Sequence, residues 1–235
     1  MHEASNNVQS VTSRWIMVFV MVYVTIVAYF VSMSIPPILP LLIKEFELTY
    51  AQGGLLVTAG VIPCIFLPLF GGMLADKYGM KLLGSVSLLP AILGSLIMAL
   101  TQSYLVALVG RFVIGIGTAI IPVITFSIIA SSFRPEEIGK AIGIRSTSTP
   151  IALTASFLVL SSIGIAYGWR TCFYLTTTLG IISLILFWAV TQREERPSVS
   201  RPKSSSKNLN FRQVLLNVEL WKLGIVWFLA FIALS

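Results

Sequence analysis

The sequence predicts an all-α membrane protein, and three observations lead to that fold class. Of its 235 residues, 56% are hydrophobic and only 11% are charged, whereas a soluble domain is about 25% charged. The apolar residues form long runs, and a membrane-spanning helix needs about 20 of them. The basic residues gather in the connections between alternate runs, a distribution typical of membrane topology.

Six runs are predicted to cross the bilayer. The charged residues within them are Arg111, Lys140 and Arg145. A seventh run begins at Val218 and stops at Ser235, which we interpret as a chain that ends inside a helix. The six predicted spans are Trp15–Ile43, Leu48–Ala75, Leu82–Leu100, Tyr104–Phe133, Ile138–Tyr167 and Thr171–Thr191.

Local signals mark the ends of several spans. Thr49 and Gln52 fit a capping box that opens the second span. Pro135, followed by two glutamates, suits the first turn of a helix. Pro36 and Pro37 cannot both continue a regular helix, so we expect the outer end of the first span to bend or unwind.

The loop charges predict an orientation. With the N-terminus inside, the inner segments hold eleven basic residues and the outer ones hold only Lys44 and Arg170. The positive-inside rule therefore predicts a cytoplasmic tail at 1–14, a six-helix unit at 15–191 and a flexible cytoplasmic linker at 192–217. Residues 218–235 would start a seventh helix in the plasma (cytoplasmic) membrane.

The six spans resemble two sets of three. Phe46 and Phe133 begin similar loops and are 87 residues apart, while Gly79 and Gly168 lie in similar tetrapeptides 89 residues apart. Because three spans are an odd number, the two sets would cross the membrane in opposite senses. Inverted repeats of this kind are typical of membrane transporters.

The connection between the second and third spans reads Gly-Gly-Met-Leu-Ala-Asp-Lys-Tyr-Gly-Met-Lys at 71–81. It resembles the loop signature of the major facilitator superfamily of solute transporters. This resemblance covers residues 15–192 and implies an N-terminal six-helix bundle of two inverted three-helix repeats. The whole fold would have twelve helices, so a C-terminal six-helix half would be a partner missing from this truncated chain.

The resemblance also implies roles for particular residues. The loop residues would form a clasp to the other half that stabilises one access state; the alternative is a tight turn that obeys the positive-inside rule. The loop residues that match the signature are Gly72, Asp76, Lys77, Gly79 and Lys81.

Arg111, Gly115 and Gly117 resemble the family's Arg-xxx-Gly-x-Gly pattern on the fourth span. The glycines would let a neighbouring helix approach closely. Arg111 lies roughly 10 Å inside the span, where an arginine faces a cavity or gate, or binds backbone carbonyls. Arg145 lies about equally far from the inner end, so it could face a cavity or extend to the cytoplasm.

Composition limits the chemistry. The six spans hold no Asp or Glu, and the only histidine is His2, so we expect no catalytic residues, metal site or cofactor. Two arginines without acids would leave a positive cavity, and our hypothesis is alternating-access transport of a small anionic solute. The bilayer and this solute are the expected partners, and nucleic acid is not.

Three other classes of protein are alternatives. A retinal protein or seven-helix receptor would need a role for Lys222 and an acidic counter-ion, which the third span lacks. A membrane enzyme would need a catalytic constellation that the sequence does not contain. A non-transporting fragment or scaffold is the remaining alternative, because one half would lack the second wall of the pathway.

Overall fold

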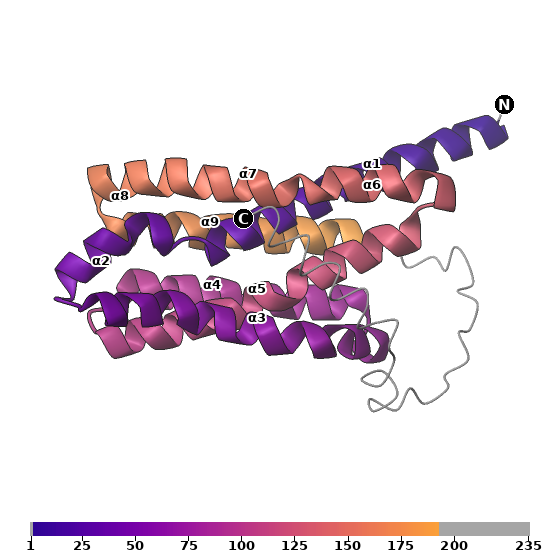
Figure 1. Ribbon diagram of the computed structural model, residues 1–235. Coiled ribbons are helices and arrows are strands. Elements are labelled where there is room, and N and C mark those ends of the chain that lie inside the picture. Colours follow the sequence, from indigo (N-terminus) through magenta and orange to yellow (C-terminus); the bar gives the residue numbers. More distant parts are fainter. Residues whose placement is uncertain (1, 193–235) are drawn as a thin grey trace, which may run out of the picture. The chain divides into compact units, whose positions relative to one another are not determined.

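The computed structural model of the protein describes residues 2–192, without the side chains of residues 2–13, Asp76 and Gln192. Gly72, Lys77 and the other predicted site residues are within this part. The predicted linker beyond Gln192 and the predicted seventh span lie outside the described residues, as do Glu219 and Lys222. Figure 1 shows the described residues as a bundle of long helices, with the α3–α4 connection at one end and the α8–α9 connection at the other.

The described residues are all-helical. The elements, in order, are α1 (His2–Ser32), the 3-10 turn η1 (Pro36–Ile38), α2 (Leu39–Glu45), α3 (Tyr50–Tyr78), α4 (Met80–Leu100), α5 (Tyr104–Ser132), α6 (Pro135–Ser146), α7 (Ser148–Ala155), the π-helical turn η2 (Ser156–Leu160), α8 (Ser161–Tyr167) and α9 (Trp169–Gln192).

Six stretches of these helices are long and apolar enough to cross a membrane, which confirms the predicted fold class for the described part of the chain. Each predicted span has its counterpart, with ends that differ by up to three residues. The six stretches are Arg14–Glu45, Tyr50–Ala75, Met80–Leu100, Tyr104–Ser132, Pro135–Tyr167 and Trp169–Thr191.

The local end signals are confirmed. At the start of α3, the Gln52 backbone N–H donates to the Thr49 hydroxyl at 3.3 Å, and the Thr49 N–H donates to the Gln52 side chain at 2.9 Å. Pro135 occupies the first turn of α6 together with two glutamates. The first span breaks after Ser32 and continues through η1 into α2, as the prolines predict.

The fifth span is not the continuous helix that its apolar run predicts. It is interrupted at Thr147, and Pro150 explains why: proline has no N–H to donate to the carbonyl of Ser146, four residues earlier. Hydroxyl groups bind other carbonyls around the break. Ser148 donates to the Arg145 carbonyl at 2.6 Å, and Thr147 donates to the Ile144 carbonyl at 2.7 Å.

Two connections at opposite ends of the bundle share one backbone conformation (Figure 1). Gly79 has φ 84° and ψ 146°, and Gly168 has φ 86° and ψ 154°. Each ends one helix by donating its N–H to the carbonyl four residues back, and a new helix starts at the next residue. Because only glycine adopts these angles without strain, the turn needs glycine at both sites.

The core has two apolar clusters along the bundle. One surrounds Met17, Ile124 and Phe187. The other surrounds Ile38 and Phe173 near the break in the first span. Both draw residues from α1 and α5, so these two helices lie at the centre of the described bundle.

Close approach between helices depends on glycine in α5. A Cβ at Gly115 would collide with the Gly60 carbonyl oxygen of α3, and a Cβ at Gly117 would collide with the Ala91 backbone nitrogen of α4. By contrast, a Cβ at Gly143 of α6 would meet nothing within 4 Å among the described residues.

We therefore expect Gly117→Ala to destabilise the protein by about 1–3 kcal/mol, the usual cost of overpacking a core. Gly143→Ala is the matched control, and it should be neutral or stabilise by up to about 1 kcal/mol through helix propensity. Thermal unfolding of the purified protein in detergent measures both. Equal melting temperatures for the two variants would contradict the role of Gly117 in α4–α5 packing.

Candidate solute-binding and gating site

Arg111 lies on α5 and is almost completely buried, with 2% of its surface exposed. Its Nη2 donates to the Ser32 carbonyl oxygen, and its Nη1 lies 3.5 Å from the Val31 carbonyl oxygen. Both carbonyls belong to the last turn of α1. This is the geometry of an arginine that binds backbone carbonyls, one of the two roles open from the sequence.

The sequence of the first span explains why these carbonyls are available. In a regular helix the Ser32 carbonyl would accept the N–H of residue 36, but residue 36 is proline and has none. The Val31 carbonyl receives a 3.3 Å hydrogen bond from the Ser34 N–H. An unpaired carbonyl inside a bilayer costs several kcal/mol, so the Arg111 guanidinium stabilises the break in the first span.

Gly60 of α3 makes room for this arginine. A Cβ at position 60 would lie 2.6 Å from Arg111 Nε and 2.8 Å from its Cζ, so only glycine fits there without displacing the guanidinium. The Cys64 thiol lies 3.5 Å from the Gly60 carbonyl oxygen and 3.8 Å from that of Gly115. Arg111 is therefore held among α1, α3 and α5.

Arg145 lies at the end of α6. Its side chain, unlike that of Arg111, is only partly buried. Its Nη2 donates to the Pro122 carbonyl oxygen at 3.0 Å and lies 3.4 Å from the Thr125 hydroxyl. Its Cζ lies 6.0 Å from the centre of the Phe126 ring, within range of a cation–π interaction. The Tyr29 phenol of α1 is close enough to interact with it electrostatically.

A chain of hydroxyl groups links Arg145 to the first span. Thr125 of α5 and Thr25 of α1 are both fully buried, and their hydroxyl oxygens lie 3.2 Å apart. Thr25 also donates to the Met21 carbonyl at 2.7 Å. Arg145 thus belongs to a polar contact that joins α6, α5 and α1 inside the bundle.

The 71–81 segment is not the loop that the sequence predicts: residues 71–78 end α3, Gly79 makes the turn, and residues 80–81 begin α4. This segment has an open surface. Gly72 is exposed, and a Cβ there would meet nothing within 4 Å among the described residues. Lys77 is also exposed, and its Nζ lies 5.1 Å from the centre of the Tyr78 ring. Lys81 is partly buried and has an interaction partner, while the side chain of Asp76 lies outside the described residues.

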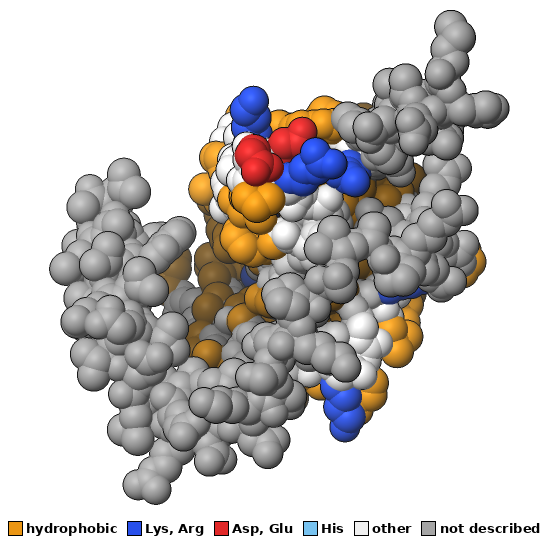
Figure 2. Space-filling view, turned by 90° about the vertical axis from the view of Figure 1, so that its right-hand side faces the viewer, with side chains coloured by type: hydrophobic (Ala, Val, Ile, Leu, Met, Phe, Trp, Pro, Cys, Tyr) orange, Lys and Arg blue, Asp and Glu red, His pale blue; other side chains and the backbone are white. Residues whose placement is uncertain are grey.

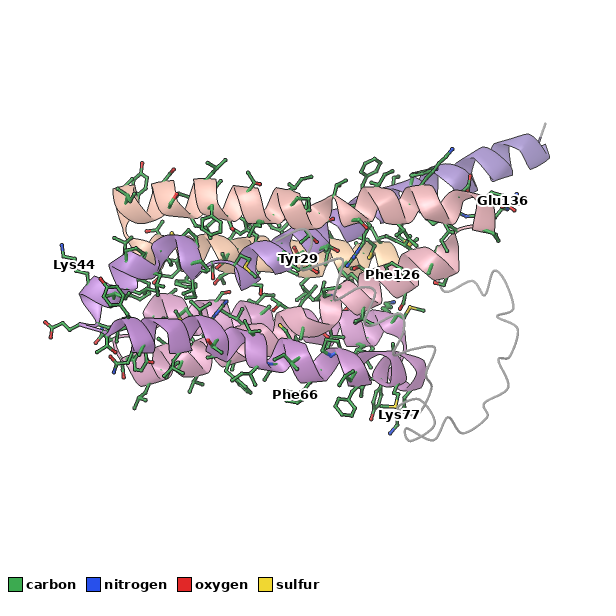
Figure 3. The ribbon with its side chains drawn as sticks, viewed as in Figure 1. Tyr29, Lys44, Phe66, Lys77, Phe126 and Glu136 are labelled. Atoms are coloured by element: carbon green, nitrogen blue, oxygen red, sulfur yellow. The ribbon has the colours of Figure 1, made fainter. Side chains whose placement is uncertain are left out.

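Lys77 and Glu136 lie at one end of the bundle and Lys44 at the other (Figure 3). Figure 2 faces the end with Lys77 and shows basic side chains there, with a group of acidic and basic side chains on its upper rim. The described basic residues of the helix ends and of the α5–α6 connection here are Arg14, Lys77, Lys81, Arg134 and Lys140.

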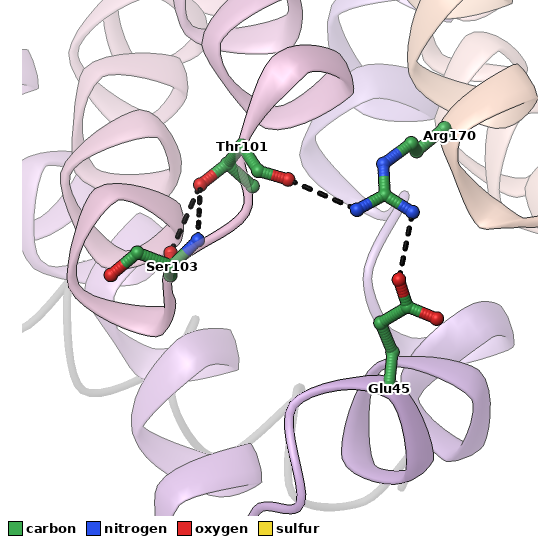
Figure 4. A network of polar contacts seen from close by, with 4 residues as sticks. All are labelled: Glu45, Thr101, Ser103 and Arg170. Atoms are coloured by element: carbon green, nitrogen blue, oxygen red, sulfur yellow. Dashed lines mark hydrogen bonds and ion pairs between the residues drawn. The ribbon is translucent and has the colours of Figure 1, made fainter.

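The opposite end holds a separate polar network (Figure 4). Arg170 Nη1 forms an ion pair with Glu45 at 2.8 Å, and its Nη2 donates to the Thr101 carbonyl at 3.2 Å. The Arg170 guanidinium also lies 4.3 Å from the centre of the Trp169 ring. This network joins the end of α2 to the start of α9 and to the α4–α5 connection.

Several partners of the two arginines were not predicted from the sequence. Pro36 was predicted to break the first span but was not connected with Arg111, and Gly60, Tyr29 and Phe126 were not predicted as partners. Pro36 lies four residues after Ser32, so the sequence alone could have indicated that the Ser32 carbonyl lacks its helical donor. Nothing in one sequence shows that Phe126 lies beside Arg145, because the two residues are on different helices.

Comparison with known proteins identifies the class. The six membrane-length helices among the described residues are those of a multi-pass membrane protein. The sequence profile described as the Major Facilitator Superfamily matches residues 21–235. The chain therefore belongs to this family of secondary transporters, which is not enzymatic, and the enzyme, receptor and retinal-protein alternatives are set aside.

Individual relatives agree with the family. Protein spinster homolog 1 of Xenopus laevis is 25% identical over 191 residues, which are 79% of this chain and 36% of that protein. The hexuronate transporter of Bacillus subtilis (strain 168) is 23% identical over 160 residues, 68% of this chain and 38% of that protein. The chain thus spans less than half the length of these curated relatives.

Solved structures show the same fold. The peptide transporter POT in complex with alafosfalin superposes with a TM-score of 0.69 at 15% identity, over 93% of this chain and 46% of that one. The proton:xylose symporter XylE bound to 6-bromo-6-deoxy-D-glucose also gives 0.69, at 14% identity, over 77% of this chain and 45% of that one. The described bundle corresponds to half of the major facilitator fold.

The contact between Arg111 and the Ser32 carbonyl predicts coupling between positions 111 and 36. Arg111→Met removes the donor, while Pro36→Ala supplies a backbone N–H that can reach the same carbonyl. We expect the double variant to lose less unfolding free energy than the sum of the losses of the two single variants, by about 0.5–3 kcal/mol. Thermal unfolding of the four proteins in detergent measures this coupling.

Pro150→Ala is the control for this cycle, because it restores an N–H far from α1 and should be additive with Arg111→Met. If Pro36→Ala and Arg111→Met were also additive, Arg111 would not be replacing the missing hydrogen bond of α1.

Proposed function

We propose that the protein moves a small anionic solute across the plasma membrane by alternating access. The observation that carries this proposal is the site around Arg145. A partly exposed guanidinium lies within a span of a bundle whose predicted spans contain no Asp or Glu. An arginine inside a membrane marks a solute or ion pathway by default, and a guanidinium binds carboxylate or phosphate through paired N–H donors.

A relative supports the same class of solute. The hexuronate transporter of Bacillus subtilis carries, by its name, a sugar with a carboxylate group. Other relatives have names that refer to drug resistance, such as quinolone resistance protein NorB of Staphylococcus aureus (strain Newman), at 27% identity. Family antiporters often carry a Gly-Pro followed by Gly-Gly on the fifth span, whereas this chain has Pro150 alone there, which argues against drug–proton antiport.

The loop and the glycines receive roles within this proposal. Gly72, Asp76, Lys77, Gly79 and Lys81 form a clasp to a second six-helix half, and the exposure of Gly72 and Lys77 supports it because a clasp needs an open surface. Arg111 fixes the break in the first span, and Gly115 and Gly117 hold α5 against its neighbours. The N-terminus and the 192–217 linker are cytoplasmic.

Transport by vesicles that contain the full-length protein tests the proposed solute class. We expect vesicles to accumulate labelled organic anions, because the Arg145 site attracts negative charge. The measurement compares uptake of an organic anion panel with that of matched amines, and vesicles without protein are the control. If amines were carried and anions neither moved nor competed, the proposal would be wrong.

Cysteine accessibility tests the orientation. In a cysteine-free background, Lys77→Cys and Lys203→Cys should both be protected from an impermeant maleimide added to intact cells, because both loops carry the basic residues of the cytoplasmic side. Lys44→Cys should be labelled. Permeabilised cells control for reactivity, and labelling of positions 77 and 203 from opposite sides would contradict the inverted repeat.

A further inference from the structure

We propose that Arg145, Phe126 and Tyr29 bind the carboxylate of a singly charged solute with an aromatic or apolar body. This inference rests on the proposed anion transport and names the class of anion. Arg145 supplies the charge, Phe126 of α5 supplies an apolar surface, and Tyr29 of α1 supplies a phenol. Figure 3 shows Tyr29 and Phe126 between the two ends of the bundle that Lys44 and Lys77 mark.

Arg111 does not take part in this site, and its contacts show why. Its two terminal nitrogens are directed at the Ser32 and Val31 carbonyl oxygens, and its Nε lies 2.6 Å from where a Cβ of residue 60 would be. With 2% of its surface exposed, it has no free edge for a solute. The Ser32 and Val31 carbonyl oxygens lie at the two terminal nitrogens, where the oxygens of an anion would otherwise bind.

Arg145 keeps one terminal nitrogen available. Its Nη2 is held by the Pro122 carbonyl and the Thr125 hydroxyl, and its Nε is buried. Among the described residues, none accepts a hydrogen bond from Nη1. The fully buried nitrogens without a partner do not include Nη1, so this atom keeps some exposed surface. The guanidinium is thus anchored along one edge and open at Nη1, where a carboxylate oxygen can accept a charge-assisted hydrogen bond.

The surroundings of Arg145 favour a solute with an apolar body. The Phe126 side chain is 43% exposed, and its ring centre lies 6.0 Å from the guanidinium carbon. A solute whose carboxylate reaches Nη1 can lay its body on this ring, because a flat apolar surface next to a cation accepts stacked aromatic groups. The Tyr29 phenol, near the guanidinium, can bind the second carboxylate oxygen.

Charge balance limits the anion to one negative charge in this half. Among the described residues, both terminal nitrogens of Arg111 face carbonyls, whereas Arg145 keeps Nη1 unused beside Phe126, so Arg145 supplies the positive charge of this site. A second carboxylate or a doubly charged phosphate would bring a charge that finds no second cation here, and burying an unpaired charge is costly. We therefore expect discrimination by charge as well as by the presence of a carboxylate.

Equilibrium binding of labelled benzoate to the full-length protein in lipid nanodiscs tests this inference. Unlabelled benzoate should compete, whereas its neutral isostere benzamide, its doubly charged analogue terephthalate and inorganic phosphate should each compete at least ~10-fold more weakly. Arg145→Gln should weaken benzoate binding by ~10- to 100-fold, the effect of losing a charge-assisted hydrogen bond. Arg145→Lys should restore part of the affinity, because it keeps the charge.

Two further variants separate recognition from folding. Phe126→Leu keeps an apolar side chain but removes the ring, and it should weaken benzoate more than acetate by ~3- to 10-fold. Arg170→Gln is the matched control: this arginine also has an aromatic and a carbonyl partner, but its charge is paired with Glu45, so benzoate binding should not change. Melting temperature and elution volume show that each variant is folded.

The outcomes distinguish this inference from the proposed function. If terephthalate or phosphate bound as tightly as benzoate, or if Arg145→Gln bound benzoate normally, the inference would be overturned while anion transport stood. If no anion bound and amines did, both would fail.

Discussion

The structure depends on one constraint, that each backbone carbonyl inside a bilayer must find a donor within the protein. Pro36 removes the donor that Ser32 would have had, and Arg111 replaces it from another helix. That contact in turn requires Gly60, because the guanidinium occupies the space of a side chain there. A break in the first span, a buried charge on the fourth and a glycine on the second are thus consequences of one missing N–H.

The repeat of three helices gives the two ends of the bundle related chemistry. Gly79 and Gly168 make the same turn at opposite ends, and the residues Phe46 and Phe133, which are 87 positions apart, each pack against a tryptophan. The ring centres of Phe133 and Trp15 lie 5.4 Å apart, and those of Phe46 and Trp169 lie 5.7 Å apart. What differs is the charge pairing. The Gly168 turn is followed by Arg170, paired with Glu45 inside this half, whereas the helix end before the Gly79 turn presents the exposed Gly72 and Lys77.

Much of this architecture could be predicted from the sequence, because the bilayer makes local signals decisive. Length and apolarity fixed the six spans, Thr49 and Pro135 marked helix starts, and Gly-containing loops marked the family. The interruption at Thr147 was not predicted, because the fifth span was predicted from its length and apolarity, and these do not show the missing N–H of Pro150. The neighbours of Arg111 and Arg145 were missed for another reason: they come from other helices, and the rotation of one helix about its axis is set by packing rather than by its own sequence.

Arg111 and Arg145 lie about equally far from the outer and inner ends of their spans, but they have different roles. The difference lies in which of their N–H donors already have partners. Arg111 faces carbonyls that cannot move away, so its charge is neutralised by dipoles that belong to the fold. Arg145 meets one carbonyl and one hydroxyl along a single edge and leaves the other edge open. An arginine whose two terminal nitrogens both face carbonyls holds helices together, whereas one with an unused terminal nitrogen next to an exposed aromatic ring is suited to bind a solute. The six predicted spans contain no acid, and in the proposed function the solute itself supplies the negative charge.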